Sequence, residues 1–174
     1  VPNVFGGNTL SGVTRNTVDV NIAGGTISQN VYGGGNAADA LGDVTVTVTD
    51  GSMVDVFGGG FGQTTVVSGN VEVNIGEKEG STLSGSGIIT GNVYGGSAMG
   101  AVNATKNSGE LSPASDKTTA VKIYALESLP GSIFGGGLGF DDSDDTNDVI
   151  AKNYGNTTVT MEGGTVGTAV YGGA

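Results

Sequence analysis

An acidic run in the last third of the chain carries the side chains best suited to chemistry. It contains five aspartates within eight residues: Asp141, Asp142, Asp144, Asp145 and Asp148. Closely spaced carboxylates can gather around a hard cation such as Ca²⁺, which takes six to eight oxygen ligands. The run lacks the central glycine and the closing glutamate of a helix-flanked calcium loop. Two interpretations therefore stand, a Ca²⁺ site on these five residues and a solvated acidic loop, and no other cofactor is expected.

A second pattern joins a β-branched residue to an aromatic residue and at least two glycines. It occurs six times, from Val4-Phe5-Gly6-Gly7 to Val170-Tyr171-Gly172-Gly173. Its aromatic residues are Phe5, Tyr32, Phe57, Tyr94, Phe134 and Tyr171. One interpretation is a stabilising ladder of offset-stacked rings. The other is an exposed strip for a glycan or protein partner, formed by Tyr32, Phe57, Tyr94, Phe134 and Tyr171.

The residue types disfavour catalysis. The chain has no His and no Cys, so a nucleophilic triad would lack its base. Sugar-cleaving chemistry needs converging carboxylates. Asp19 and Glu72 are expected on one outward strand face, but Thr45 interrupts the row and Arg15 is the only arginine. We therefore expect no enzymatic activity and keep a polysaccharide-acting enzyme as the third alternative.

The charge of the chain excludes further partners. Six lysines and arginines against 17 aspartates and glutamates give a formal net charge of -11. Nucleic-acid binding requires clustered cationic side chains, and anionic membrane surfaces attract basic segments. The apolar stretches are also too short for a membrane-spanning helix. We therefore expect no nucleic-acid partner and no membrane insertion.

The spacing of the aromatic residues indicates the length of a repeat unit. They lie 27, 25, 37, 40 and 37 residues apart, and a stretch with apolar residues at alternate positions precedes each later copy. The clearest stretches are 18–22, 44–48 and 71–75, rich in valine. This period of two is typical of β-strands with one buried face. A unit of about 26 residues, lengthened by three insertions near 77–87, 97–116 and 138–153, accounts for the spacing.

Such a unit predicts one coil of a parallel β-solenoid. A single coil cannot bury its own apolar face, but stacked coils bury a continuous column of valine and isoleucine. Each coil is expected to contain a five-residue strand, a glycine corner, a short strand such as 25–27, and the aromatic motif. An antiparallel sandwich explains the alternation but not the fixed phase of the aromatics, so the solenoid is preferred. We predict an all-β solenoid of about five to six coils.

Two insertions fall in the same connection of successive repeats. They occupy 97–116 and 138–153, between an aromatic motif and the next long strand. Stacked coils would make them project side by side from one edge. Functional residues concentrate on loops carried by a rigid scaffold. This edge is a candidate partner surface, with tolerated surface insertions as the alternative.

The repeat resembles a known class of proteins. Alternating Val/Thr strands, Gly-Gly-Thr-Ile/Val corners and Val-Tyr/Phe-Gly-Gly are similar to the glycine-rich, adhesin-like and autotransporter-passenger-like repeats of bacterial surface proteins. This resemblance covers nearly the whole chain outside the insertions. It implies a right-handed parallel β-helix that acts as a stalk or an adhesive surface, and it assigns no catalytic residue.

These observations favour a structural and adhesive segment of a bacterial cell-surface or secreted protein. The alternative is a carbohydrate-binding module that uses the aromatic strip or the paired insertions. We expect residues 1–174 to form one solenoid domain within a longer repetitive protein, located outside the cell. Its expected partners are a surface glycan or protein, and its ends are expected to stack on flanking coils or on other chains.

Overall fold

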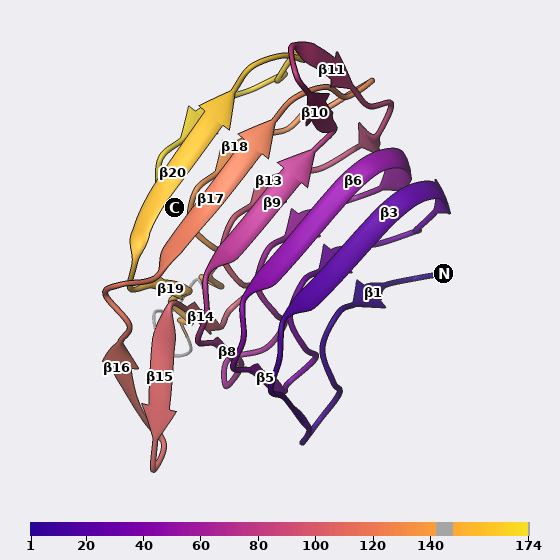
Figure 1. Cartoon of the computed structure of the whole chain (residues 1–174). Coiled ribbons are helices and arrows are strands. Elements are labelled where there is room, and N and C mark those ends of the chain that lie inside the picture. The colour runs from indigo at the N-terminus through magenta and orange to yellow at the C-terminus, as the bar shows by residue number, and fades with distance from the viewer. Residues whose placement is uncertain (142–147, 174) are drawn as a thin grey trace.

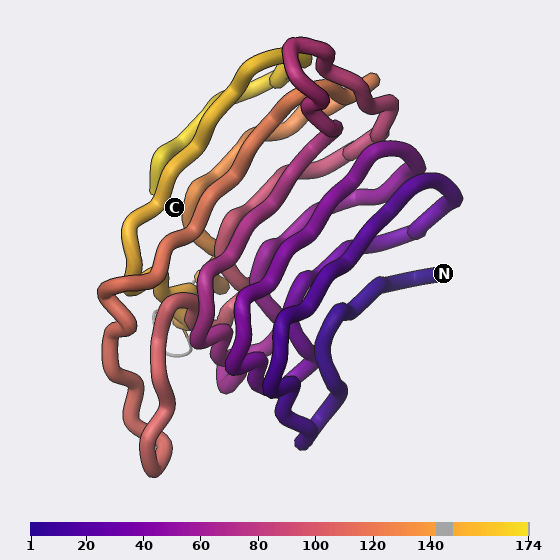
Figure 2. The backbone as a smooth tube through the Cα atoms, viewed as in Figure 1, coloured from indigo at the N-terminus to yellow at the C-terminus, as the bar shows by residue number. Residues whose placement is uncertain are grey.

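The computed structural model describes residues 1–141 and 148–173 of the chain. Its strands form three parallel sheets that run along one stack of coils (Figures 1 and 2). The chain advances through the stack from the N-terminal end at one side to the C-terminal end at the other, and each turn is right-handed (Figure 2). The predicted parallel β-solenoid is therefore confirmed.

The first sheet, here called the aromatic sheet, contains the six copies of the sequence motif. Its strands lie in chain order: β1 (Val4–Phe5), β4 (Val31–Tyr32), β7 (Val56–Phe57), β13 (Val93–Tyr94), β18 (Ile133–Phe134) and β21 (Val170–Tyr171). Each valine or isoleucine pairs with that of the next coil, and each ring with the next ring. The motif thus marks the same corner of every coil.

The second sheet, the long-strand sheet, contains the alternating stretches. Its strands are β3 (Val18–Thr26), β6 (Val44–Met53), β9 (Val71–Ile75), β12 (Ile88–Ile89), β17 (Thr118–Ile123) and β20 (Asn156–Met161). β3 and β6 continue through a corner into a second segment, and β12 pairs with the end of β6. The expected short strand at 25–27 overlaps this second segment of β3, which ends at Thr26.

A third sheet was absent from the sequence-based expectation. It consists of two-residue strands: β2 (Val13–Thr14), β5 (Asp39–Ala40), β8 (Val66–Val67), β14 (Ala101–Val102) and β19 (Lys152–Asn153). Two residues are too few to show a periodicity, which explains why the pattern did not reveal them. Each coil therefore has three sides, and its cross-section is triangular in outline.

Two antiparallel hairpins leave the stack. One consists of β10 (Glu77–Glu79) and β11 (Thr82–Ser84), and the other of β15 (Ala104–Asn107) and β16 (Glu110–Pro113). They project at opposite ends of the coils in the view of Figure 1. Ser108 and Gly109 have φ of 49° and 89°, as a two-residue hairpin turn of this kind requires.

The interior is filled by side chains from all three sheets. β9 shows the alternation directly, because Val71, Val73 and Ile75 are buried while Glu72 and Asn74 lie on the outer face. The core continues from Val18 in the first coils to Ile133 near the end of the stack. Apolar burial on this scale is the main favourable term in folding.

The first glycine after each aromatic residue allows the aromatic and long-strand sheets to approach closely. A Cβ atom on Gly33 would overlap the carbonyl oxygen of Gly58 and the methyl groups of Val44 and Val46. The same conflict recurs at the equivalent glycines Gly6, Gly58 and Gly95. At Gly172, in the last coil, a Cβ atom would meet nothing within 4 Å.

We therefore predict unequal effects of one substitution at two equivalent positions. Gly33→Ala should lower the free energy of unfolding by about 2–4 kcal/mol, because the added methyl forces coils apart in a packed interior. Gly172→Ala should change it by less than about 0.5 kcal/mol. Urea titration followed by circular dichroism measures both values. Equal effects of the two variants would contradict the close approach seen at Gly33.

Candidate functional site

The six aromatic rings form one stacked column along the outside of the aromatic sheet. Successive ring centroids lie 4.7–5.0 Å apart, and successive ring planes differ by only 4–10°. This spacing equals the distance between neighbouring strands, so the pairing of the coils sets the stacking distance. Offset stacking adds about 0.5–1.5 kcal/mol for each pair beyond the burial of apolar area. The stabilising ladder that the sequence suggested is therefore present.

Burial decides which parts of the column a ligand can touch. The exposed fractions are 4% for Tyr32, 1% for Phe57 and 5% for Tyr94, whereas Tyr171 at the end is 49% exposed. Phe5 and Phe134 are partly buried against the central rings. The faces of the central rings are covered by one another, and each of these three residues leaves at most 5% of its surface to a ligand. A binding strip along all five predicted rings stays a prediction.

A ladder of polar side chains lies immediately before the aromatic strands. The backbone N–H of Asn30 donates to Asn3 Oδ1 at 3.0 Å, and that of Asp55 to Asn30 Oδ1 at 3.1 Å. The series continues from Asn92 N–H to Asp55 Oδ1 at 2.7 Å and from Ser132 N–H to Asn92 Oδ1 at 2.9 Å. Each side chain thus satisfies a backbone donor of the next coil. Sequence reasoning missed these residues, although a polar residue directly before the first five of the six motifs was the available signal.

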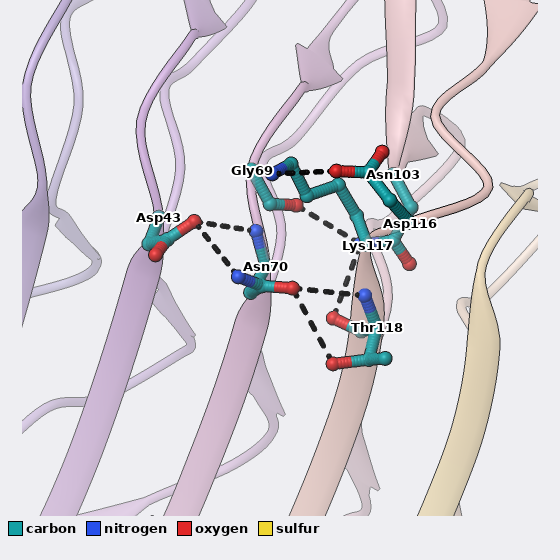
Figure 3. Close-up of polar contacts among 7 residues, drawn as sticks. All are labelled: Asp43, Gly69, Asn70, Asn103, Asp116, Lys117 and Thr118. Atoms are coloured by element: carbon teal, nitrogen blue, oxygen red, sulfur yellow. Dashed lines mark hydrogen bonds and ion pairs between the residues drawn. The ribbon is translucent and has the colours of Figure 1, made fainter.

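A second polar ladder lies at the corner that begins the long-strand sheet (Figure 3). Asp43 Oδ1 accepts from the backbone N–H of Asn70 at 2.7 Å, and Asn70 Oδ1 accepts from that of Thr118 at 3.0 Å. The side-chain amide of Asn103 donates to the carbonyl oxygens of Gly69 at 2.9 Å and Thr118 at 3.1 Å. Asn103 has φ of 56°, which asparagine tolerates better than most residues. These bonds fix the root of the β15–β16 hairpin.

On the outer face of the long-strand sheet, the Glu72 carboxylate is paired with neighbouring side chains. The register places Asp19, Thr45 and Glu72 in one row across neighbouring strands. Lys122 Nζ donates to Glu72 Oε2 at 2.6 Å, and Asn74 Nδ2 donates to Glu72 Oε1 at 2.9 Å. Burial opposes the ionisation of Glu72, but these hydrogen bonds and the charge of Lys122 lower its pKa. A carboxyl group with a lowered pKa is poorly suited to act as a general acid near neutral pH. The absence of enzymatic activity stays a prediction.

The calcium hypothesis rests mostly on residues outside the described part of the chain. Asp142, Asp144 and Asp145 lie outside the described residues, whereas Asp141 and Asp148 are described. Within 1–141 and 148–173, no group of three or more acidic side chains is placed to hold a metal ion. The Ca²⁺ site therefore stays a prediction.

The second and third insertions leave the stack at different points but meet in space. The β15–β16 hairpin follows β14, whereas the third insertion precedes β19, so residues 97–102 belong to the coil itself. A cavity of about 300 Å³ is lined by Leu111 of the hairpin and by Val149 and Ile150 of the third insertion. Lys106 Nζ donates to the carbonyl oxygen of Thr64 at 3.1 Å and anchors the hairpin to an earlier coil. The expected neighbouring positions are thus observed, and a partner surface there stays a prediction.

Comparisons add no assignment to this geometry. No protein-family model, no curated protein and no solved structure matches the chain. Within the described residues, the structure contains no helix with the length and apolar character needed to cross a bilayer.

Truncation of a central ring should cost far more stability than truncation of the terminal ring. Phe57→Ala should lower the free energy of unfolding by about 3–5 kcal/mol, because it removes two stacking contacts and leaves a cavity. Tyr171→Ala removes one contact from a half-exposed ring and should cost about 1 kcal/mol. Chemical denaturation of both variants gives the comparison. Similar losses would show that the column does not hold the coils together.

Two buried tyrosines should make stability fall in alkaline solution. Burial raises the pKa of both Tyr32 and Tyr94, and the negative charge of Asp55 acts in the same direction. Their stabilisation is complete below the unfolded tyrosine pKa of about 10 and is lost as pH rises through the folded pKa. Between about pH 9 and 11, the double variant Tyr32→Phe/Tyr94→Phe should lose less unfolding free energy than the parent. Parallel pH profiles from urea titrations would contradict this.

Proposed function

We propose that the chain is a structural and adhesive segment of a bacterial cell-surface or secreted protein. One observation carries the structural part. The residues that recur in every coil are used to join coils, with the rings stacked 4.7–5.0 Å apart and the preceding polar side chains bonded to the next coil. Because the recurring residues join one coil to the next, they support a role as a rigid stalk. This is the role that the resemblance to bacterial surface proteins implies.

The adhesive part rests on what varies between coils. The two hairpins differ from coil to coil and project from the stack, and loops on a rigid support are where binding residues concentrate. The expected partners are a surface glycan or a protein, and the net charge of -11 disfavours nucleic acid. Val170 and Tyr171 are about half exposed, which supports contact of this end with further coils or with another chain.

A second candidate function is that of a carbohydrate-binding module. The cavity between Leu111 and the third insertion favours it, because ligand sites are concave and combine apolar walls with a few polar groups. Lys152 and Gln63 supply polar groups there. This candidate places binding at the paired insertions.

Surface display tests the adhesive function. The chain, fused to a display carrier on a non-adherent bacterial host, should increase attachment to epithelial monolayers or glycan-coated surfaces several-fold over the carrier alone. A matched variant replaces residues 106–111 by Asn-Gly, which retains the Thr105–Ser112 pair around a two-residue turn. Loss of attachment in this variant would assign adhesion to the paired insertions. Attachment at the level of the carrier on every surface would contradict the proposal.

A further inference from the structure

A groove crosses the first three coils beside the aromatic column. Its volume is about 430 Å³, within the range of about 300–1,000 Å³ typical of small-molecule sites. Its lining combines aromatic rings, side-chain amides and a single carboxylate: Asn3, Phe5, Gln29, Asn30, Tyr32, Asn36, Val54, Asp55 and Phe61. Among the described residues, none from the insertions at 97–116 and 138–153 lines the groove.

Phe61 supplies an aromatic wall that the repeat itself does not require. Its backbone is paired with Asn36 on one side and Ala98 on the other, so the two neighbouring coils carry an amide and a methyl group at this position. The Phe61 ring centroid lies 5.6 Å from that of Tyr32, with the planes inclined by 55°. Phe61 is 37% exposed, whereas Tyr32 is 4% exposed. The inclined ring therefore stands beside the stacked column and offers surface to a ligand.

The amides of the groove are held in place by one another. Asn3 Nδ2 donates to Gln29 Oε1 at 2.7 Å, and Asn30 Nδ2 donates to the Tyr32 hydroxyl at 2.9 Å. Asn3 Oδ1 and Asn30 Oδ1 each accept a backbone N–H of the following coil. These bonds orient the polar wall before any ligand arrives, which lowers the entropic cost of binding.

Two side chains that line the groove have donor or acceptor groups that are not used within the described part of the protein. The Asn36 amide and the Gln29 amide nitrogen make no hydrogen bond to another residue among those that the structure describes. An amide carries both donors and acceptors. The groove therefore presents both kinds of group next to an exposed ring.

This chemistry matches a neutral sugar. A pyranose ring has a face of C–H groups, which packs on the negative face of an aromatic ring, and hydroxyls that donate and accept hydrogen bonds. Asp55 is the only charged residue among the described residues that line the groove, and the whole chain has a net charge of -11. Both features repel anionic sugars such as uronates.

We propose that the groove between Phe61 and the amides of Gln29 and Asn36 binds a neutral saccharide. The proposal rests on the second candidate function, carbohydrate binding, and places it at the first three coils instead of the paired insertions. Tyr32 contributes its hydroxyl and ring edge, while its ring face remains in the column. A sugar hydroxyl donates a hydrogen bond to the Asp55 carboxylate oxygen that does not serve the polar ladder.

Immobilised polysaccharides provide the test, with a panel of neutral glucans, mannans and galactans and a second panel of uronate-containing polymers. The whole chain should be retained by at least one neutral polymer and by no uronate polymer. Phe61→Ala should weaken that retention at least tenfold, and Gln29→Ala/Asn36→Ala should weaken it by a similar factor. Leu41→Ala, which removes a comparably exposed apolar side chain outside the groove, should leave it unchanged.

The variants distinguish the possible failures. Melting temperatures establish that each variant is folded, and the double amide variant supplies the comparison if Phe61→Ala unfolds. Retention that survives both groove variants but is lost when residues 106–111 become Asn-Gly would overturn the groove and support the paired insertions. Retention by no polymer of either panel would overturn both carbohydrate proposals and leave the structural function standing. Preferential retention by uronate polymers would overturn the assignment to neutral sugars.

Discussion

The distance between neighbouring strands constrains every other feature of this molecule. Parallel strands pair at about 4.8 Å, so each side of each coil must lie at that distance from the next coil. Planar rings can stack at this separation with a small offset, and side-chain amides can reach the backbone of the next coil. At Gly33, Gly58 and Gly95, the backbone itself comes so close to the next coil that no side chain fits. The aromatic motif satisfies these requirements together at one corner.

The same constraint determines where the chain is free to vary. Positions that face the next coil are limited to residues that repeat the contact, whereas positions that point outward have no such restriction. Phe61, Asn36 and Ala98 are paired through their backbones, yet they differ completely in chemistry. The hairpins likewise begin where a strand of the stack has ended. A molecule of this kind can change what it binds without changing how it is held together, which supports the proposed combination of scaffold and adhesive surface.

The sequence predicted the parts of the fold that depend on periodicity. The valine alternation of β6 and β9 and the fixed phase of the rings were sufficient to predict stacked parallel coils. The two-residue strands of the third sheet were not predictable, because Asp39–Ala40 and Lys152–Asn153 share no residue type. Strand alternation alone could not predict the exposure of Tyr32. Its side chain points outward from the strand, but the neighbouring rings bury it. The groove could not be foreseen, because it joins Gln29 and Phe61 from different coils and different corners.

Native-state hydrogen exchange tests most directly whether the aromatic corner unites the coils into one cooperative structure. The N–H groups of Gly33, Gly58 and Gly95 donate to the carbonyl oxygens of Phe57, Tyr94 and Phe134 in the following coils, each at 2.9 Å. These amides should exchange only through global unfolding, with equal free energies of opening that fall together in denaturant, whereas amides of the β10–β11 hairpin should exchange by local opening. Separate opening energies for the three glycines, or values as low as those of the hairpin, would contradict this account.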